Sequence, residues 1–87
     1  HRGCPSPFRV RCVVHYEIPR PGVVHLQIFD VSGSPVRDFV HKWHSPGVYT
    51  VVWDGSANDG TELPSGVYIL RMEYSGFVAT QKVVLLR

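Results

Sequence analysis

The spacing of its turn signals constrains this chain more than any other feature. Clusters of Gly, Pro, Asp and Ser recur about every 8–12 residues. The segments between them show no 3.6-residue period, which an amphipathic helix would require. Instead, apolar and polar residues alternate, most clearly from Val10 to Ile18. A period of two places successive side chains on opposite faces of a strand, so the sequence predicts an all-β chain.

The length of the chain and its predicted strands define the fold class. A chain of 87 residues forms one domain. Strands with one apolar face must bury that face against a second sheet. We therefore expect an immunoglobulin-like antiparallel β-sandwich of about seven strands over residues 8–87, preceded by an arm or linker over residues 1–7. A seventh strand would lie near residues 62–63 or in the arm. The clear predicted strands cover residues 10–18, 24–28, 36–41, 49–53, 67–74 and 77–86.

Charge and hydropathy exclude several classes of partner. The net charge is only +2 and the basic residues are scattered, so the basic patch of a nucleic-acid-binding protein is missing. No apolar run approaches the roughly 18 residues of a membrane span. The chain begins at His1 rather than Met and shows no signal peptide. We expect a processed protein or part of a longer one, secreted or held at a bacterial cell surface.

The two cysteines, Cys4 and Cys12, are eight residues apart. In an oxidising compartment they are candidates for a local disulfide. Cys12 also falls within a predicted strand, where a cysteine commonly serves as a small core residue. Both interpretations stay open, because a sequence does not show the geometry that a disulfide requires.

No set of side chains in the sequence suggests catalysis, a metal or a cofactor. The carboxylates and serines fall mostly at turns or on outward strand positions, and no nucleophile, base and orienting group are paired. His41 and His44 lack the cysteines and the helix that would make them a zinc site. Residues 54–60 resemble a calcium loop but lack its third-position ligand and its closing Glu. If Ile18 pairs with Val24, His25 would face Glu17 as a surface pair.

Six short motifs follow one another in a fixed order along nearly the whole chain. Each motif alone is common, and their order and spacing make the set specific. They are Pro5-Ser6-Pro7-Phe8, Ile18-Pro19, Phe29-Asp30-Val31-Ser32-Gly33, Trp53-Asp54-Gly55, Ser65-Gly66-Val67-Tyr68 and the final Lys82-Val83-Val84-Leu85-Leu86-Arg87.

Together these motifs resemble the Ig-like sorting domains at the C-termini of proteins exported by type IX secretion. The pattern is also similar to the Ig-like domain of the flagellar hook-capping protein. Cys4, Cys12 and Pro35 depart from the sorting-domain pattern. The resemblance implies a sandwich whose terminal strand is read by an export apparatus.

Most of the motif residues also have a structural task in a sandwich. Trp53 is expected to anchor the two sheets, and Asp54 to accept hydrogen bonds from the loop that follows it. Tyr68 is expected to form a tyrosine corner, with its ring buried and its hydroxyl bonded to the backbone. The predicted structural residues are Phe8, Asp30, Gly33, Trp53, Asp54, Gly55, Gly66 and Tyr68.

The final strand is apolar on both faces, which a strand with one solvated face would not be. The N-terminal arm or a neighbouring strand would cover it if it is purely structural. Alternatively it is a recognition surface for secretion or assembly proteins, or for copies of the chain, which could add a strand to its edge. The candidate contact residues are Lys82, Val83, Val84, Leu85, Leu86 and Arg87.

Three functions fit these observations, and none of them is enzymatic. The first is a C-terminal sorting and cell-surface attachment domain of a secreted bacterial protein. The second is a structural subunit or assembly module of an extracellular filament or hook-cap-like scaffold, joined through its terminal strands. The third is a carbohydrate-binding module that would stack sugar rings on Trp43, Tyr74 or Phe77.

Overall fold

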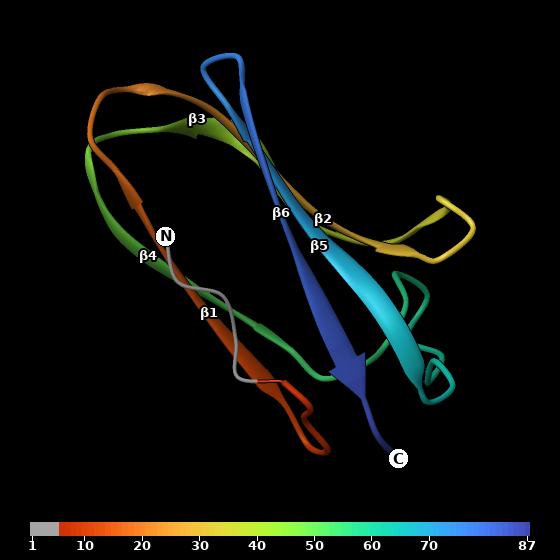
Figure 1. The fold of residues 1–87 in the computed structure, drawn as a ribbon. Coiled ribbons are helices and arrows are strands. Elements are labelled where there is room, and N and C mark those ends of the chain that lie inside the picture. The colour runs from red at the N-terminus through yellow and green to blue at the C-terminus, as the bar shows by residue number, and fades with distance from the viewer. Residues whose placement is uncertain (1–5) are drawn as a thin grey trace.

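The computed structural model describes residues 6–87 and shows a sandwich of six antiparallel strands with no helix in that part of the chain (Figure 1). The all-β fold class is confirmed, with six strands where about seven were expected. The strands are β1 (Cys12–Ile18), β2 (Gly22–Asp30), β3 (Pro35–His44), β4 (Gly47–Trp53), β5 (Gly66–Tyr74) and β6 (Phe77–Leu85).

The strands form a two-stranded sheet, β1-β4, and a four-stranded sheet in the order β3-β2-β5-β6. In Figure 1 the β1–β4 pair lies apart from the other strands, across the sandwich. Consecutive strands β1 and β2 therefore lie in different sheets, and the predicted His25–Glu17 pair is wrong. His25 instead places its Nε2 3.3 Å from Oδ1 of Asp38 on β3, whereas Glu17 lies opposite Val48 on β4.

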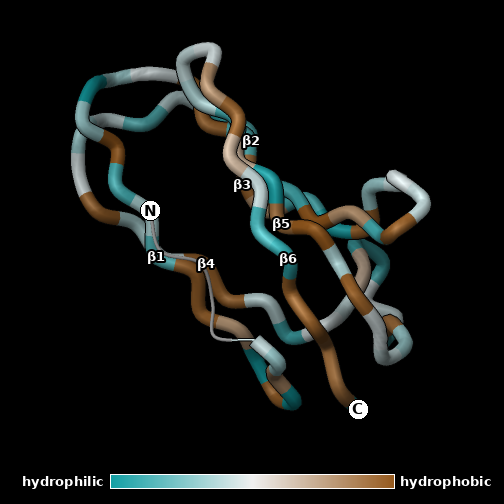
Figure 2. The backbone as a smooth tube through the Cα atoms, in the orientation of Figure 1, coloured by the Kyte–Doolittle hydropathy of each residue, from teal (hydrophilic) through white to brown (hydrophobic). Residues whose placement is uncertain are grey.

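The core is formed mainly by the inward residues of β1, β2, β5 and β6 together with Trp53, and partly buried residues of β3 and β4 pack against it. The predicted inward residues of β2, Val24, Leu26 and Ile28, are fully buried. Val10 was expected to begin the first strand, but β1 begins at Cys12 and Val10 is 77% exposed. Figure 2 shows that the last part of β6 is strongly hydrophobic. The buried apolar residues are Phe8, Cys12, Val14, Tyr16, Ile18, Val24, Leu26, Ile28, Trp53, Tyr68, Leu70, Val83 and Leu85.

Near residues 62–63 the structure has a single bridge rather than a seventh strand. A second single bridge forms at Phe8, just after the predicted arm, of which residues 1–5 lie outside the described part of the chain. Phe8 bridges Leu85 in parallel, and Ser56 bridges Glu62. Pro7 precedes Phe8 and has no N–H to donate, so it cannot extend the pairing as an ordinary residue would. Each site thus adds a local backbone contact rather than a strand.

Strand β3 runs three residues beyond the predicted end at His41. His44 is buried, and its Nε2 lies 2.9 Å from the hydroxyl of Tyr16 on β1. The buried imidazole therefore has a hydrogen-bond partner inside the sandwich, as buried polar groups usually do. The predicted hairpin turn at Ser75-Gly76 is present, with φ of 50° and 80°, the left-handed values that a type I′ turn requires.

Candidate functional site

The C-terminal segment, residues 82–87, was predicted to contact partners. Val83 and Leu85 are fully buried in the core, and Val84 and Leu86 are half-buried. Lys82 and Arg87 are the exposed members of the segment. The apolar inner face of this strand is thus occupied by the domain's own core.

The edge of β6 at this end is also occupied. The N–H of Phe8 donates to the Val84 carbonyl, and the Leu86 N–H donates to the Phe8 carbonyl, each at 2.9 Å. The Ser6 hydroxyl accepts from the Val84 N–H at 2.8 Å. Residues 6 and 8, one of them assigned to the predicted arm, therefore cover the end of β6 that was considered an open edge.

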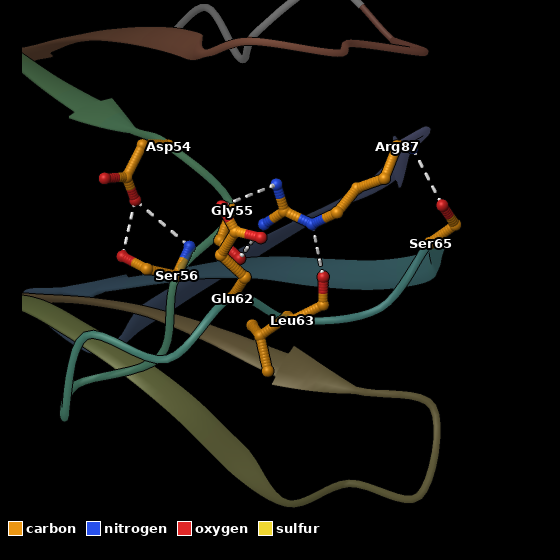
Figure 3. Close-up of polar contacts among 7 residues, drawn as sticks. All are labelled: Asp54, Gly55, Ser56, Glu62, Leu63, Ser65 and Arg87. Carbon is orange, nitrogen blue, oxygen red and sulfur yellow. Dashed lines mark hydrogen bonds and ion pairs between the residues drawn. The ribbon is translucent and has the colours of Figure 1, made fainter.

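Arg87 fastens the chain end to the loop that follows β4 (Figure 3). Its Nη2 donates to the Gly55 carbonyl at 2.8 Å and its Nε to the Leu63 carbonyl at 2.6 Å. Its backbone N–H donates to the Ser65 hydroxyl at 2.8 Å. A weaker ion pair at 4.0 Å joins Arg87 to Glu62. The last residue is therefore held in place by the domain itself.

Gly55 makes this close approach feasible. Its φ is +83°, a conformation that side chains rarely adopt. A Cβ at this position would lie 2.7 Å from Nη2 of Arg87 and 3.1 Å from Cδ2 of Leu85. The backbone conformation therefore favours glycine here, and an added Cβ would displace the Arg87 guanidinium.

The predicted core anchors pack together at the same end of the sandwich. The ring of Trp53 lies 5.3 Å from that of Phe8 and 5.4 Å from that of Tyr68, between centroids. Its Nε1–H donates to the Ser56 carbonyl at 2.9 Å. The Tyr68 hydroxyl donates to the Pro64 carbonyl at 2.7 Å, the geometry of a tyrosine corner. Gly66 begins β5 opposite Leu85.

Three aspartates organise the polar turns by accepting hydrogen bonds from the residues that follow them. Oδ1 of Asp54 accepts from the N–H of Ser56 at 3.0 Å and from its hydroxyl. Asp30 accepts from Ser32 and Ser34, next to Gly33 with its φ of +88°. Asp59 accepts from Thr61. Residues 6–87 hold no group of three side chains that could bind a metal.

These hydrogen bonds set the acid response of the domain. Bonds from the hydroxyl and the N–H of Ser56 lower the pKa of Asp54 below its ordinary value of 3.8. Bonds from Ser32 lower the pKa of Asp30, and bonds from Thr61 lower that of Asp59. A lowered folded-state pKa contributes stability that is present above the unfolded value and is lost as the pH falls through the folded value.

We therefore expect the domain to lose stability as the pH falls below the ordinary aspartate pKa of 3.8, and Asp54→Asn to flatten that loss. Asparagine keeps the acceptor oxygen but has no proton to gain in this range. Chemical denaturation across this pH range measures the slope. Asp54→Ala serves as the control, because it removes the turn's acceptor and should lower stability at neutral pH as well. An unchanged slope in Asp54→Asn would contradict this account.

The three aromatic residues considered for sugar stacking do not form one platform. Trp43 is 60% exposed on β3, and Phe77 is 76% exposed on β6. These are the two opposite outer strands of the four-stranded sheet. Tyr74 is half-buried, and its hydroxyl donates to the Arg20 carbonyl. The arrangement therefore gives no support to the carbohydrate-binding hypothesis.

The edges of β3 and β4 differ in how far they are covered, a difference that none of the sequence motifs indicated. The edge of β3 is covered by Asn58, whose side-chain oxygen accepts from the Asp38 N–H at 2.8 Å and whose N–H donates to the Val36 carbonyl. Strand β3 also has two register shifts against β2. Within residues 6–87, strand β4 pairs with β1 alone, and it carries no charge, no proline and no register shift. In the sequence, the seven consecutive uncharged residues from Gly47 to Trp53 were the feature that could have indicated this edge.

Cys12 is buried and is not a free thiol. Cys4 lies outside the described residues, so the predicted Cys4–Cys12 bridge stays a prediction. Within residues 6–87 the structure contains no helix long and apolar enough to cross a membrane.

An antiparallel two-sheet sandwich whose motif residues serve packing and turns is a structural Ig-like domain. A model of the FlgD Ig-like domain family matches residues 13–76, and the chain belongs to this family. The solved structure of FlgD from P. aeruginosa is similar at 19% identity and a TM-score of 0.63, over 95% of this chain and 70% of that one. No curated protein matches the chain.

The comparisons support one half of the predicted resemblance. The likeness to the hook-capping Ig-like domain is confirmed by the family match and by the shared fold. Neither comparison supports a type IX sorting domain. The prediction of a non-catalytic domain agrees with membership in a family of structural domains.

Proposed function

We propose that this domain is a non-catalytic assembly module of an extracellular bacterial structure, such as a hook-cap-like scaffold. The observation that carries the proposal is the edge of β4, which among the described residues has a strand partner on the β1 side only, whereas Asn58 covers part of the β3 edge and residues 6 and 8 cover the end of β6. Natural proteins usually protect the exposed edge strands of their sheets with charged residues, prolines or bulges, because the unpaired backbone groups of an edge can pair with other strands. An edge left without these devices is suited to protein contact.

The family supports an assembly role over a sorting role. FlgD is a component of the flagellar hook, and this chain shares its Ig-like domain family and fold. The burial of Val83 and Leu85 also disfavours recognition of the terminal strand by an export receptor. These two side chains would have to leave the core before a receptor could contact them. The partners we propose are assembly proteins or copies of the chain, and the location is extracellular or on the cell surface.

Photo-crosslinking in the producing bacterium tests this function. A photoreactive residue at Val48 or Val52, both on the outer face of β4, is expected to yield adducts with protein. The matched control places the same group at Val10 or Val31, each 77% exposed and outside the strands. Adducts at β4 well above the control support an assembly module. Absence of protein adducts at β4, with the chain exported, would overturn the proposal.

A further inference from the structure

Strand β4 has the composition of a strand that pairs with another strand. Its sequence, Gly-Val-Tyr-Thr-Val-Val-Trp, contains three valines and one threonine and no charged residue. In the described chain it has a strand partner on one side only, β1. Every second residue of an antiparallel strand directs its backbone N–H and C=O away from a given neighbour. The side of β4 away from β1 therefore offers a row of donors and acceptors.

The strand is also self-complementary about Thr50. In an antiparallel pair of two β4 strands centred on this residue, Thr50 would face Thr50 of the other copy. Val48 would then face Val52 on the outer face, where these residues are 72% and 47% exposed. Pairs of β-branched residues and of threonines stabilise antiparallel strands. No like charges would meet along the seven residues.

The inner face of the same edge has room for side chains of a second strand. A groove of about 370 Å³ lies between β3 and β4, lined by the apolar Val40 and Val51, by Tyr49, and by the polar His44 and Lys42 among others. In the symmetric pairing, Val51 of each copy would face Tyr49 of the other on this side. Their side chains would extend the core over the groove, which the domain alone leaves open.

Pairing would also complete the smaller sheet. A two-stranded sheet is marginal without further strands or covering elements. Two copies joined through β4 would form a continuous sheet in the order β1-β4-β4-β1, equal in strand number to the other sheet. A two-fold interface of this kind closes on itself.

We propose that two copies of this chain associate by antiparallel pairing of their β4 strands about Thr50. The inference rests on the proposed assembly function and names its partner as a second copy. A foreign strand added to the same edge is the alternative that the experiment separates from it.

Sedimentation equilibrium of the 87-residue chain over a concentration series tests the pairing. The wild-type chain is expected to reach twice its mass of 9.8 kDa. Val48→Lys/Val52→Lys places lysines opposite each other twice and should weaken the dimer about tenfold or more. Val48→Lys/Val52→Glu keeps both substitution sites but places opposite charges across the interface, and should restore the dimer.

Two controls make the result specific. Val31→Lys/Val78→Lys adds the same charge at exposed valines away from β4 and should leave the dimer unchanged. Added salt should weaken the Lys/Glu dimer and leave the wild-type dimer nearly unaffected, because only the former depends on exposed charges. Circular dichroism of each variant confirms that it is folded.

A wild-type chain that stays at 9.8 kDa throughout overturns self-pairing. So does a dimer that the Lys/Lys variant leaves intact, or one that the Lys/Glu variant fails to restore. Crosslinks from Val48 and Val52 to other proteins, with none to a second copy, would overturn self-pairing while leaving the assembly function supported.

Discussion

Trp53→Ala is expected to cost about 3–5 kcal/mol of the free energy of unfolding, the range for removing a large aromatic residue from a core. The side chain is fully buried, contacts Phe8 and Tyr68, and donates to the Ser56 carbonyl. Its loss would leave a cavity between the sheets and remove the shorter of the hydrogen bonds that the Ser56 carbonyl accepts. Small domains have only about 5–15 kcal/mol in total, so the variant should be substantially unfolded at moderate denaturant concentrations.

Trp43→Ala is the matched control, because the same atoms are removed from an exposed site on β3. Its effect should stay within about 0.5 kcal/mol, as for most surface substitutions. Urea unfolding followed by far-ultraviolet circular dichroism compares the two variants without relying on either tryptophan as a probe. Similar losses from both would contradict the placement of Trp53 as the central anchor.

Gly55→Ala is expected to cost about 3 kcal/mol, combining the left-handed backbone with a steric clash. The added methyl group would lie 2.7 Å from Nη2 of Arg87 and 3.1 Å from Leu85. The guanidinium would have to leave the Gly55 carbonyl, and the end of the chain would loosen. Urea unfolding measures the loss, and amide exchange in residues 84–87 should become faster.

Gly60→Ala separates the two contributions. Gly60 has a φ of +88°, close to that of Gly55, and an added Cβ would meet no atom within 4 Å. Its substitution should therefore cost only the backbone part, about 1 kcal/mol. Gly55→Ala/Arg87→Ala should cost less than the sum of its two single variants, because both act on one contact. Equal losses from Gly55→Ala and Gly60→Ala would exclude the steric contribution.

The parts of the fold that depend on local pattern were predictable. Alternation identified the inward face of β2, and Ser75-Gly76 identified the hairpin between β5 and β6. Each of these features is encoded within a few neighbouring residues. The tasks of Asp54 and Tyr68 were likewise predictable, because each bonds to backbone two to four residues away.

Features that depend on distant pairing were not predictable. The sequence does not show that β1 pairs with β4 rather than with β2, since every strand has a compatible apolar face. The extension of β3 to His44 depends on Tyr16, 28 residues earlier. The fixing of Arg87 depends on carbonyls at Gly55 and Leu63, which carry no side-chain signal.

Because of these distant contacts, the surface proposed to bind partners differs from the one that the sequence indicated. The sequence directed attention to the chain ends, where apolar residues 83–86 lie next to Arg87. In the structure this end is bound by Ser6, Phe8 and the loop after β4. The edge on which the proposed function rests is instead that of β4, in the middle of the chain, which has a strand partner on one side only among the described residues.

Backbone hydrogen exchange tests the central claim most directly, by comparing the isolated chain at low concentration with the assembled material. We expect assembly to slow exchange within residues 47–53. Residues 83–86 should already exchange slowly in the isolated domain and change little. Slowed exchange confined to residues 82–87, with 47–53 unchanged, would contradict the claim and return the contact surface to the C-terminal strand.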